Sequence, residues 1–210
     1  MIQTVLFDLD GTLVDSERVF LRGNVQAAHA LGLKRSEADF LPLVGAAGDH
    51  EAELIDSLVG AANRAAFVSK TVAYVDDQLD HGPSIALPGA DELLQTLQAH
   101  GRQVGVVTSS SPAHLTQVLH NTGWQDRFDL QVTLAHGAPK PAPDLYQHAL
   151  AVGHLAPDAT VAVEDTPLGV AAAVAAGLSC VQVPDLTQAS NQATVVLRNL
   201  AMVGQWILPR

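Results

Sequence analysis

The stretch "VLFDLDGTLVDSE", residues 5–17, runs from three apolar residues directly into two aspartates. Side chains alternate between the two faces of an extended chain, so Asp8 and Asp10 are expected on the same side at the end of a strand. Two neighbouring carboxylates repel each other unless one binds a proton, a cation lies between them, or both point into water. The stretch alone therefore fits either a solvated acidic turn or a cation site.

Length and composition describe a folded, acidic protein. The chain has 210 residues, of which 48% are hydrophobic and only 16% are charged, which suits a compact protein with a sizeable core. A formal net charge of -11 argues against a nucleic-acid partner and against an anionic membrane surface. We expect neither kind of partner, and we expect the protein to be a monomer.

The N-terminal segment lacks the basic stretch and the uninterrupted apolar run of an export signal, because the two aspartates interrupt it. The longest apolar stretch begins at Gly169, is rich in alanine and is broken by Gly177 and Gln182. It therefore favours a helix, a turn and a strand over a membrane span. A single cysteine, Cys180, excludes an intramolecular disulfide and a multi-cysteine metal site. We expect a cytoplasmic protein in which Cys180 is a buried, inert thiol.

Short apolar runs rich in β-formers alternate with helical patterns along most of the chain. The predicted strands are residues 4–9, 104–108, 130–133, 161–163 and 180–183. The clearest helices between them are residues 89–100, 112–122 and 167–176, and each is followed by a glycine. This alternation predicts an α/β fold, a Rossmann-like, doubly wound parallel sheet with helices on both faces.

Residues 16–82 interrupt this alternation, because they show helical patterns and no convincing strand. Four amphipathic helices are predicted there, at residues 18–32, 36–45, 49–62 and 64–79. We therefore expect an all-helical domain, residues 16–82, inserted into a core domain made of residues 1–15 and 83–210. Residues 11–15, which begin with Gly11, and residues 81–90, which contain Pro83, Pro88 and Gly89, are the expected connections, so the insert would be able to close over the end of the first strand.

Polar side chains cluster where the predicted strands end, which is where parallel α/β sheets bind ligands. These residues are Asp8 and Asp10 after the first strand, Thr108, Ser109, Ser110 and Ser111 after the second, Glu164 and Asp165 after the fourth, and Lys140 in the loop "PKPAPD". Taken singly, each also fits a helix cap, a turn or a solvated loop residue. Together they supply oxygen ligands for a divalent cation, donors for phosphate oxygens and one positive charge.

These motifs resemble those of the haloacid dehalogenase (HAD) superfamily, in the subgroup of β-phosphoglucomutases and small sugar-phosphate phosphatases. The resemblance rests on "DLDGT" (8–12), "VVTSSS" (106–111), "PKPAPD" (139–144) and "VEDTPLGVAAAVAAG" (163–177), in this order along the chain. It covers essentially the whole chain, and the predicted helical insert lies where that family carries a helical cap. The resemblance implies the α/β core, the cap and phosphoryl-transfer chemistry with Mg²⁺.

Carried over to this sequence, the resemblance implies that Asp8 is the nucleophile that forms an aspartyl-phosphate. Asp10 would act as the general acid that protonates the leaving alcohol and then as the base that activates water. The implied Mg²⁺ ligands are the Asp8 carboxylate, the Asp10 backbone carbonyl and Asp165, with Glu164 as an outer or water-mediated ligand.

The resemblance also implies a catalytic serine and a catalytic lysine. Ser109 would bind a phosphoryl oxygen, although Thr108 is one position away and is an alternative for this role. Lys140 would balance the negative charge of Asp8 and the phosphoryl group. The nine histidines show no spacing typical of metal ligands, and most are expected at the surface.

Two departures from the family pattern bear on the reaction. The stretch "LVGAAGDH" (43–50) lacks the arginine with which β-phosphoglucomutases grip a second phosphate, and "SERVF" (16–20) lacks their histidine. A third departure is Pro139, which replaces the usual glycine before Lys140. The first two weaken the mutase interpretation and favour a phosphatase.

The leading hypothesis is a Mg²⁺-dependent phosphatase that hydrolyses a small phosphate monoester, a sugar or polyol phosphate, through an aspartyl-phosphate. The first alternative is a β-phosphoglucomutase-type phosphomutase. A dehalogenase, which uses the first aspartate without a metal, is disfavoured because Asp10 and Asp165 are retained. A non-enzymatic alternative is a regulatory protein that senses a phosphorylated metabolite without turnover. The expected partner in every phosphate-based hypothesis is a small phosphorylated metabolite.

Overall fold

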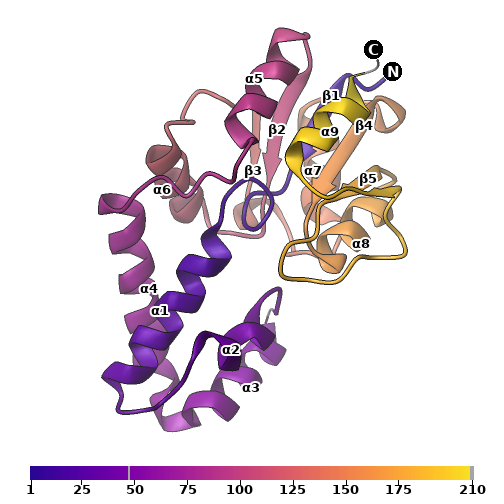
Figure 1. Ribbon diagram of the computed structural model, residues 1–210. Helices are drawn as coiled ribbons and strands as arrows, with labels where there is room; N and C mark the ends of the chain where they lie inside the picture. The colour runs from indigo at the N-terminus through magenta and orange to yellow at the C-terminus, as the bar shows by residue number, and fades with distance from the viewer. Residues whose placement is uncertain (47, 209–210) are drawn as a thin grey trace. The chain divides into compact units, whose positions relative to one another are not determined.

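The computed structural model describes residues 1–46 and 48–208. The chain divides into two compact units, one made of Met1–Val14 and Ile85–Arg210 and the other of Asp15–Ser84 (Figure 1). The first unit contains all the strands among the described residues. The second unit is helical.

A six-stranded parallel sheet forms the centre of the first unit, with strand order β3-β2-β1-β4-β5-β6. The strands are β1 (Thr4–Phe7), β2 (Gln103–Val107), β3 (Leu130–Val132), β4 (Thr160–Glu164), β5 (Ser179–Gln182) and β6 (Val195–Val196). In the register of the sheet, Val5 lies between Val104 and Val161. The parallel sheet predicted from the sequence is therefore confirmed, with β6 as an additional short edge strand.

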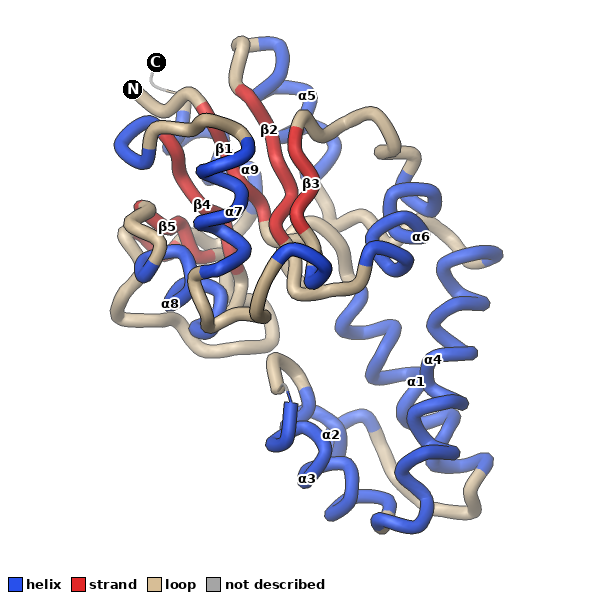
Figure 2. Tube along the Cα trace, turned by 180° about the vertical axis from the view of Figure 1, so that it is seen from behind, coloured by secondary structure: helices blue, strands red, loops and turns tan. Residues whose placement is uncertain are grey.

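Helices cover both faces of the sheet, as Figures 1 and 2 show from opposite sides. On one face, α7 (Asp144–Val152) and α8 (Pro167–Ala175) pack against the buried Leu6, Ala162 and Cys180. The other face carries α5 (Ala90–Ala99) and α9 (Leu200–Ile207), which pack against each other. A doubly wound α/β fold is thus confirmed, and the single thiol is buried as expected.

The starts of two helices explain how polar residues are presented where the strands end. Ser111 caps α6 (Pro112–Thr122), because its Oγ accepts a hydrogen bond from the backbone N–H of His114 at 3.2 Å. Thr166 caps α8 in the same way, with Gly169 as the donor. Each cap is followed by a proline at the first helical position, which needs no hydrogen-bond acceptor for its nitrogen. Both strand–helix connections are therefore fixed in conformation by local sequence.

The helical unit contains α1 (Ser16–Ala30), α2 (Glu37–Phe40), a 3-10 turn at Leu41–Leu43, α3 (Gly48–Val59), a 3-10 turn at Ala61–Asn63 and α4 (Arg64–His81). Helix α1 packs along α4, and buried Thr71 donates a hydrogen bond to Asn24 Oδ1 at 3.1 Å. Phe40 stacks on Phe67 with ring centroids 5.5 Å apart. The prediction of one helix over residues 36–45 was too long, because a tighter turn that includes Pro42 replaces its second half.

In the described part of the chain, no helix combines the length and the apolar character that crossing a membrane requires.

Candidate active site

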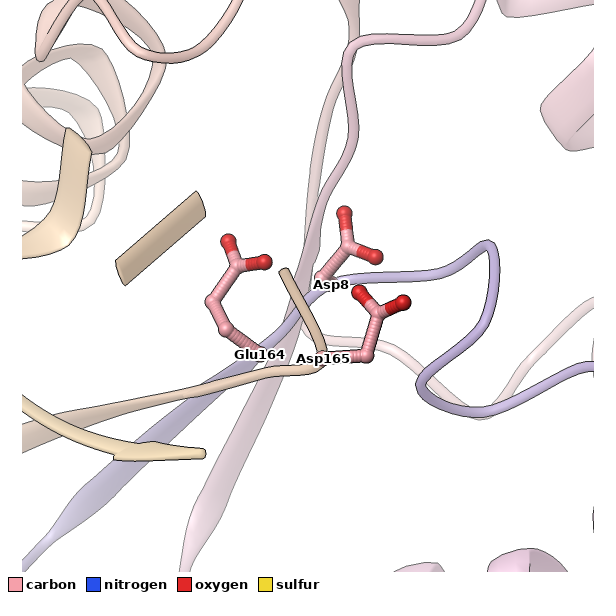
Figure 3. Close-up of side chains that lie close together, drawn as sticks. All are labelled: Asp8, Glu164 and Asp165. Carbon is pink, nitrogen blue, oxygen red and sulfur yellow. The ribbon is translucent and has the colours of Figure 1, made fainter. Parts of the chain in front are cut away.

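Three buried carboxylates meet where β1 and β4 end, as Figure 3 shows. Asp8 directly follows β1, Glu164 is the last residue of β4, and Asp165 follows it. Because β1 and β4 are adjacent and parallel, their carboxyl ends lie together at one edge of the sheet. Each of the three residues offers one carboxylate oxygen, and these oxygens lie within 4.8 Å of one another.

Lys140 is the buried cation of this cluster. Its Nζ lies 2.5 Å from Asp8 Oδ1 and 2.7 Å from Glu164 Oε1, and it donates a further hydrogen bond to the Val107 carbonyl at 2.8 Å. Burial opposes charging this amine, but the carboxylates of Asp8 and Glu164 outweigh burial and raise the pKa of Lys140 above its usual value. Lys140 therefore carries a positive charge in the site.

Lys140 does not bring the pKa of Asp8 back to its usual value. Burial raises the pKa of Asp8 to about 8, with Glu164 and Asp10 adding to the rise and Lys140 opposing it. The ammonium group of Lys140 alone therefore does not balance the carboxylates of Asp8, Glu164 and Asp165. A divalent cation would supply the missing positive charge.

Glu164 is held by Lys140 and Tyr146. The Tyr146 hydroxyl donates to Glu164 Oε1 at 2.5 Å, and it is the same oxygen that Lys140 contacts. The other oxygen, Oε2, is buried and has no hydrogen-bond partner among the described residues. A Cβ at Gly169 would overlap this carboxylate, so a larger residue at that position would displace Glu164 from its contacts with Lys140 and Tyr146.

Asp165 is held through its backbone and its side chain. Its carbonyl accepts hydrogen bonds from Gln182 Nε2 at 2.9 Å and from Thr187 Oγ1 at 2.8 Å. Thr12 Oγ1 donates to its carboxylate at 3.4 Å. Gly11 lies against this carboxylate with φ 79°, where a Cβ would overlap it. The loop after β1 therefore approaches Asp165 closely because it contains glycine.

Asp10 is contacted by residues of the connection between β2 and α6 and by the first turn of α6. Ser110 Oγ donates to Asp10 Oδ2 at 2.7 Å, and Thr108 Oγ1 lies 3.4 Å from the same oxygen. His114 Nε2 lies 2.9 Å from Asp10 Oδ1. Ser109 takes a different position, because its Oγ accepts a hydrogen bond from the Lys140 backbone N–H at 3.1 Å.

The residues selected from the sequence therefore come together at one sheet edge, in two linked groups. Asp8, Lys140, Glu164 and Asp165 form the buried acidic cluster, and Ser109 is tied to it through the Lys140 backbone. Asp10 joins a polar group formed by Thr108, Ser110 and His114. The expectation that most histidines lie at the surface gave no reason to single out His114, and Tyr146 was also missed.

The donor set fits a hard divalent cation. Three carboxylates offer oxygen ligands within reach of one point, and the partnerless Oε2 of Glu164 is a buried acceptor that lacks a donor. Burial first, and then the neighbouring Glu164 and Asp10, raise the pKa of Asp8, so a cation at this place would favour the ionised carboxylate. The residues present thus suit a divalent metal ion.

Replacing Lys140 by methionine is expected to lower the free energy of unfolding by about 3 kcal/mol at neutral pH, because breaking a buried ion pair leaves unpaired charge inside the protein. Asp8 and Glu164 would both lose their nearest cation. Urea denaturation followed by circular dichroism measures the change. Lys70→Met, at an exposed position in α4, is the matched control. Equal stability of the Lys140→Met variant and the wild type would contradict this description of the cluster.

A doubly wound α/β sheet with buried carboxylates and a paired lysine at its carboxyl edge defines an α/β protein with the parts of an enzyme active site. Comparison with known proteins agrees with this class. Residues 5–183 match the family model described as haloacid dehalogenase-like hydrolase. The chain belongs to the haloacid dehalogenase-like hydrolase family, which confirms the family and the enzyme class expected from the motifs.

Three similar proteins illustrate the relationship. A Lacticaseibacillus casei protein described as an uncharacterized protein in the fgs 3' region is 46% identical over 199 residues, which cover 94% of this chain and 92% of that protein. Hexitol phosphatase B of Escherichia coli O157:H7 is 30% identical over 213 residues, covering 96% and 91% of the two chains. The crystal structure of CbbY from Rhodobacter sphaeroides in complex with phosphate has 25% identity and a TM-score of 0.80, and covers 97% of both chains.

Proposed function

We propose that the protein is a Mg²⁺-dependent phosphatase that hydrolyses a small phosphate monoester, a sugar or polyol phosphate, through an aspartyl-phosphate on Asp8. The observation that carries this proposal is the contact of buried Asp8 with Lys140 beside Glu164 and Asp165. A nucleophilic carboxylate next to a fixed cation and a set of oxygen ligands is what phosphoryl transfer requires. Similarity to a hexitol phosphatase, and to a structure that contains phosphate, supports the substrate class.

In the first step, a carboxylate oxygen of Asp8 forms a bond to phosphorus while the bond from phosphorus to the alcohol oxygen breaks. Asp10 gives its proton to the leaving oxygen, so the product departs as a neutral alcohol. In the second step, water attacks phosphorus as Asp10 takes a proton from it, and the bond to Asp8 breaks. Inorganic phosphate leaves, and the Asp8 carboxylate is restored.

The other residues stabilise charge during both steps. Lys140 offsets the negative charge of Asp8 and of the transferred phosphoryl group. We propose that Asp8, Asp165 and the Asp10 carbonyl would hold Mg²⁺, with Glu164 acting through a water molecule. The bound ion would supply a Lewis acid for the phosphoryl oxygens. Ser109 accepts from the Lys140 backbone, so its own hydroxyl proton is available for a phosphoryl oxygen, and Thr108 is the second candidate donor.

The helical unit, for which we keep the sequence boundaries 16–82, is proposed to act as a cap that selects the alcohol part of the substrate. An inserted unit joined by two connections suits opening and closing around a ligand. A cytoplasmic location, a monomeric state and a small phosphorylated metabolite as the partner remain predictions from the sequence.

A screen of hexitol, sugar and aryl phosphates with Mg²⁺, read out as inorganic phosphate release, tests the proposal. We expect release from at least one polyol or sugar phosphate. Because "LVGAAGDH" lacks an arginine, we expect no more than trace conversion of β-glucose 1-phosphate to glucose 6-phosphate. Faster isomerisation than hydrolysis would favour the phosphomutase, and binding of a phosphorylated metabolite without turnover would favour the sensor.

The affinity for Mg²⁺ is expected to strengthen as pH rises toward 8. Burial raises the pKa of Asp8 to about 8, so at lower pH the cation must displace a proton from this carboxyl. Between about pH 6 and about pH 8, the dissociation constant should fall on the order of 10-fold or more. Isothermal titration calorimetry at the two pH values measures this change. An affinity that is independent of pH would contradict the role of Asp8 as a ligand.

A further inference from the structure

Both carboxylate oxygens of Asp10 contact side chains from the segment that joins β2 to α6 and from the first turn of α6. Oδ1 faces His114 Nε2 at 2.9 Å, and Oδ2 accepts from Ser110 Oγ at 2.7 Å. The His114 and Asp10 side chains are 15% and 20% exposed, so water has little access to the contact between them. Of these three residues, His114 alone lies outside the sequence motifs.

We propose that His114 is a positioning residue that orients Asp10 for its proton transfers, an inference that rests on the proposed phosphatase function. A carboxyl group fixed through only one oxygen retains freedom to rotate about the bond that joins it to Cβ. A second contact, on the opposite oxygen, removes that freedom. His114 supplies this second contact, with its Nε2–H as the donor.

Hydrogen bonds fix the backbone positions of His114 and Ser110. Its backbone N–H donates to Ser111 Oγ at the cap of α6, so the side chain projects from the first turn of that helix. Ser110, on the other side of Asp10, is itself fixed, because its N–H donates to Thr108 Oγ1 and its carbonyl accepts from the Leu134 N–H. Both contacts on Asp10 thus come from groups with defined backbone positions, which is the arrangement that orients a catalytic group.

The chemical consequence depends on the leaving group. A poorly basic leaving oxygen, such as that of p-nitrophenol, departs without a proton, whereas a more basic phenol or alkyl oxygen needs the proton from Asp10. Misorientation of Asp10 should therefore slow formation of the phosphoenzyme for phenyl phosphate and leave it nearly unchanged for p-nitrophenyl phosphate. A structural defect in the site would slow both reactions alike.

The test compares His114→Ala, His114→Gln and the wild type in single-turnover reactions with these two esters and Mg²⁺. We expect His114→Ala to lower the maximal phosphorylation rate with phenyl phosphate on the order of 10-fold, and with p-nitrophenyl phosphate less than about twofold, with an unchanged substrate dissociation constant for both. Gln places an amide N–H near the position of Nε2, so His114→Gln should recover most of the rate. His120→Ala, at the exposed second histidine of α6, is the matched control.

Ser110→Ala tests the opposite oxygen of Asp10 and should show the same dependence on the leaving group. The proposed role of His114 is wrong if His114→Ala and Ser110→Ala lower the phosphorylation rate equally with the two esters, or lower it with neither. It is also wrong if His114→Gln does not recover the rate with phenyl phosphate. Should the wild type release phosphate from neither ester nor from any compound of the screen, the phosphatase function itself fails. A wild type that is active, with variants that lack leaving-group dependence, overturns the role of His114 alone.

Discussion

Asp8→Asn is expected to lower turnover by on the order of 10⁴-fold or more while the chain keeps its fold. The amide has nearly the same shape as the carboxyl but is a poor nucleophile, so no aspartyl-phosphate forms. Asp8 is buried at the end of β1, and its backbone N–H donates to the Val163 carbonyl. The substitution does not alter this backbone group. The change therefore removes the reacting oxygen and leaves the backbone pairing intact. Steady-state phosphate release, together with circular dichroism, measures both parts of the prediction.

Asp158→Asn, at an exposed position in the short turn before β4, is the matched control and should retain full activity. If Asp8→Asn turned over at the wild-type rate, the nucleophile would be a different residue. Loss of activity in both variants would point to a general effect of removing negative charge.

Chelation of divalent cations with EDTA is expected to reduce activity to background, and addition of Mg²⁺ in excess is expected to restore it. Without the ion, the three buried carboxylates lose a counter-charge that the contacts of Lys140 with Asp8 and Glu164 do not replace, and the phosphoryl oxygens lose their Lewis acid. Phosphate release before chelation, after chelation and after readdition measures the effect. Undiminished turnover after complete chelation would contradict metal dependence.

A second readout for the metal does not depend on turnover. A ligand that binds only the folded state stabilises it, by about 2.7 kcal/mol at a free concentration 100 times its dissociation constant. Mg²⁺ should therefore raise the melting temperature of the wild type. Asp165→Asn, which removes one carboxylate of the cluster, should reduce that shift.

Much of the fold could be predicted because strands that are buried on both faces of a sheet have apolar residues at consecutive positions in the sequence. The residues of β1 and the last four residues of β2 are all buried, and apart from Thr4 the sequence accordingly shows them as short apolar runs. Helix α6 was predicted with both ends correct, because Pro112 and Gly123 mark its boundaries. The strand β6 was missed, since two residues at a sheet edge carry no pattern.

The acidic cluster could be foreseen because topology brings together residues that simply follow strands. Asp8 and Asp165 follow strands that are adjacent in a parallel sheet, so the order of the strands is sufficient to place them near each other. The contacts of Tyr146 and His114 could not be foreseen in the same way. Each projects from a helix, and its partner depends on the rotation and the tilt of that helix against the sheet. A histidine at the start of α6 looks the same in the sequence whether it faces water or Asp10.

The most direct test of the central claim is to identify the residue that carries the phosphoryl group during turnover. The protein is mixed with p-nitrophenyl phosphate and Mg²⁺, quenched in acid, and treated with borohydride, which reduces an acyl phosphate to the corresponding alcohol. Mass spectrometry of the peptides then locates the change. We predict phosphorylation, and after reduction homoserine, at position 8 alone, with neither product in Asp8→Asn. Continued phosphate release with an unmodified Asp8, or with the phosphoryl group on another residue, would contradict the account.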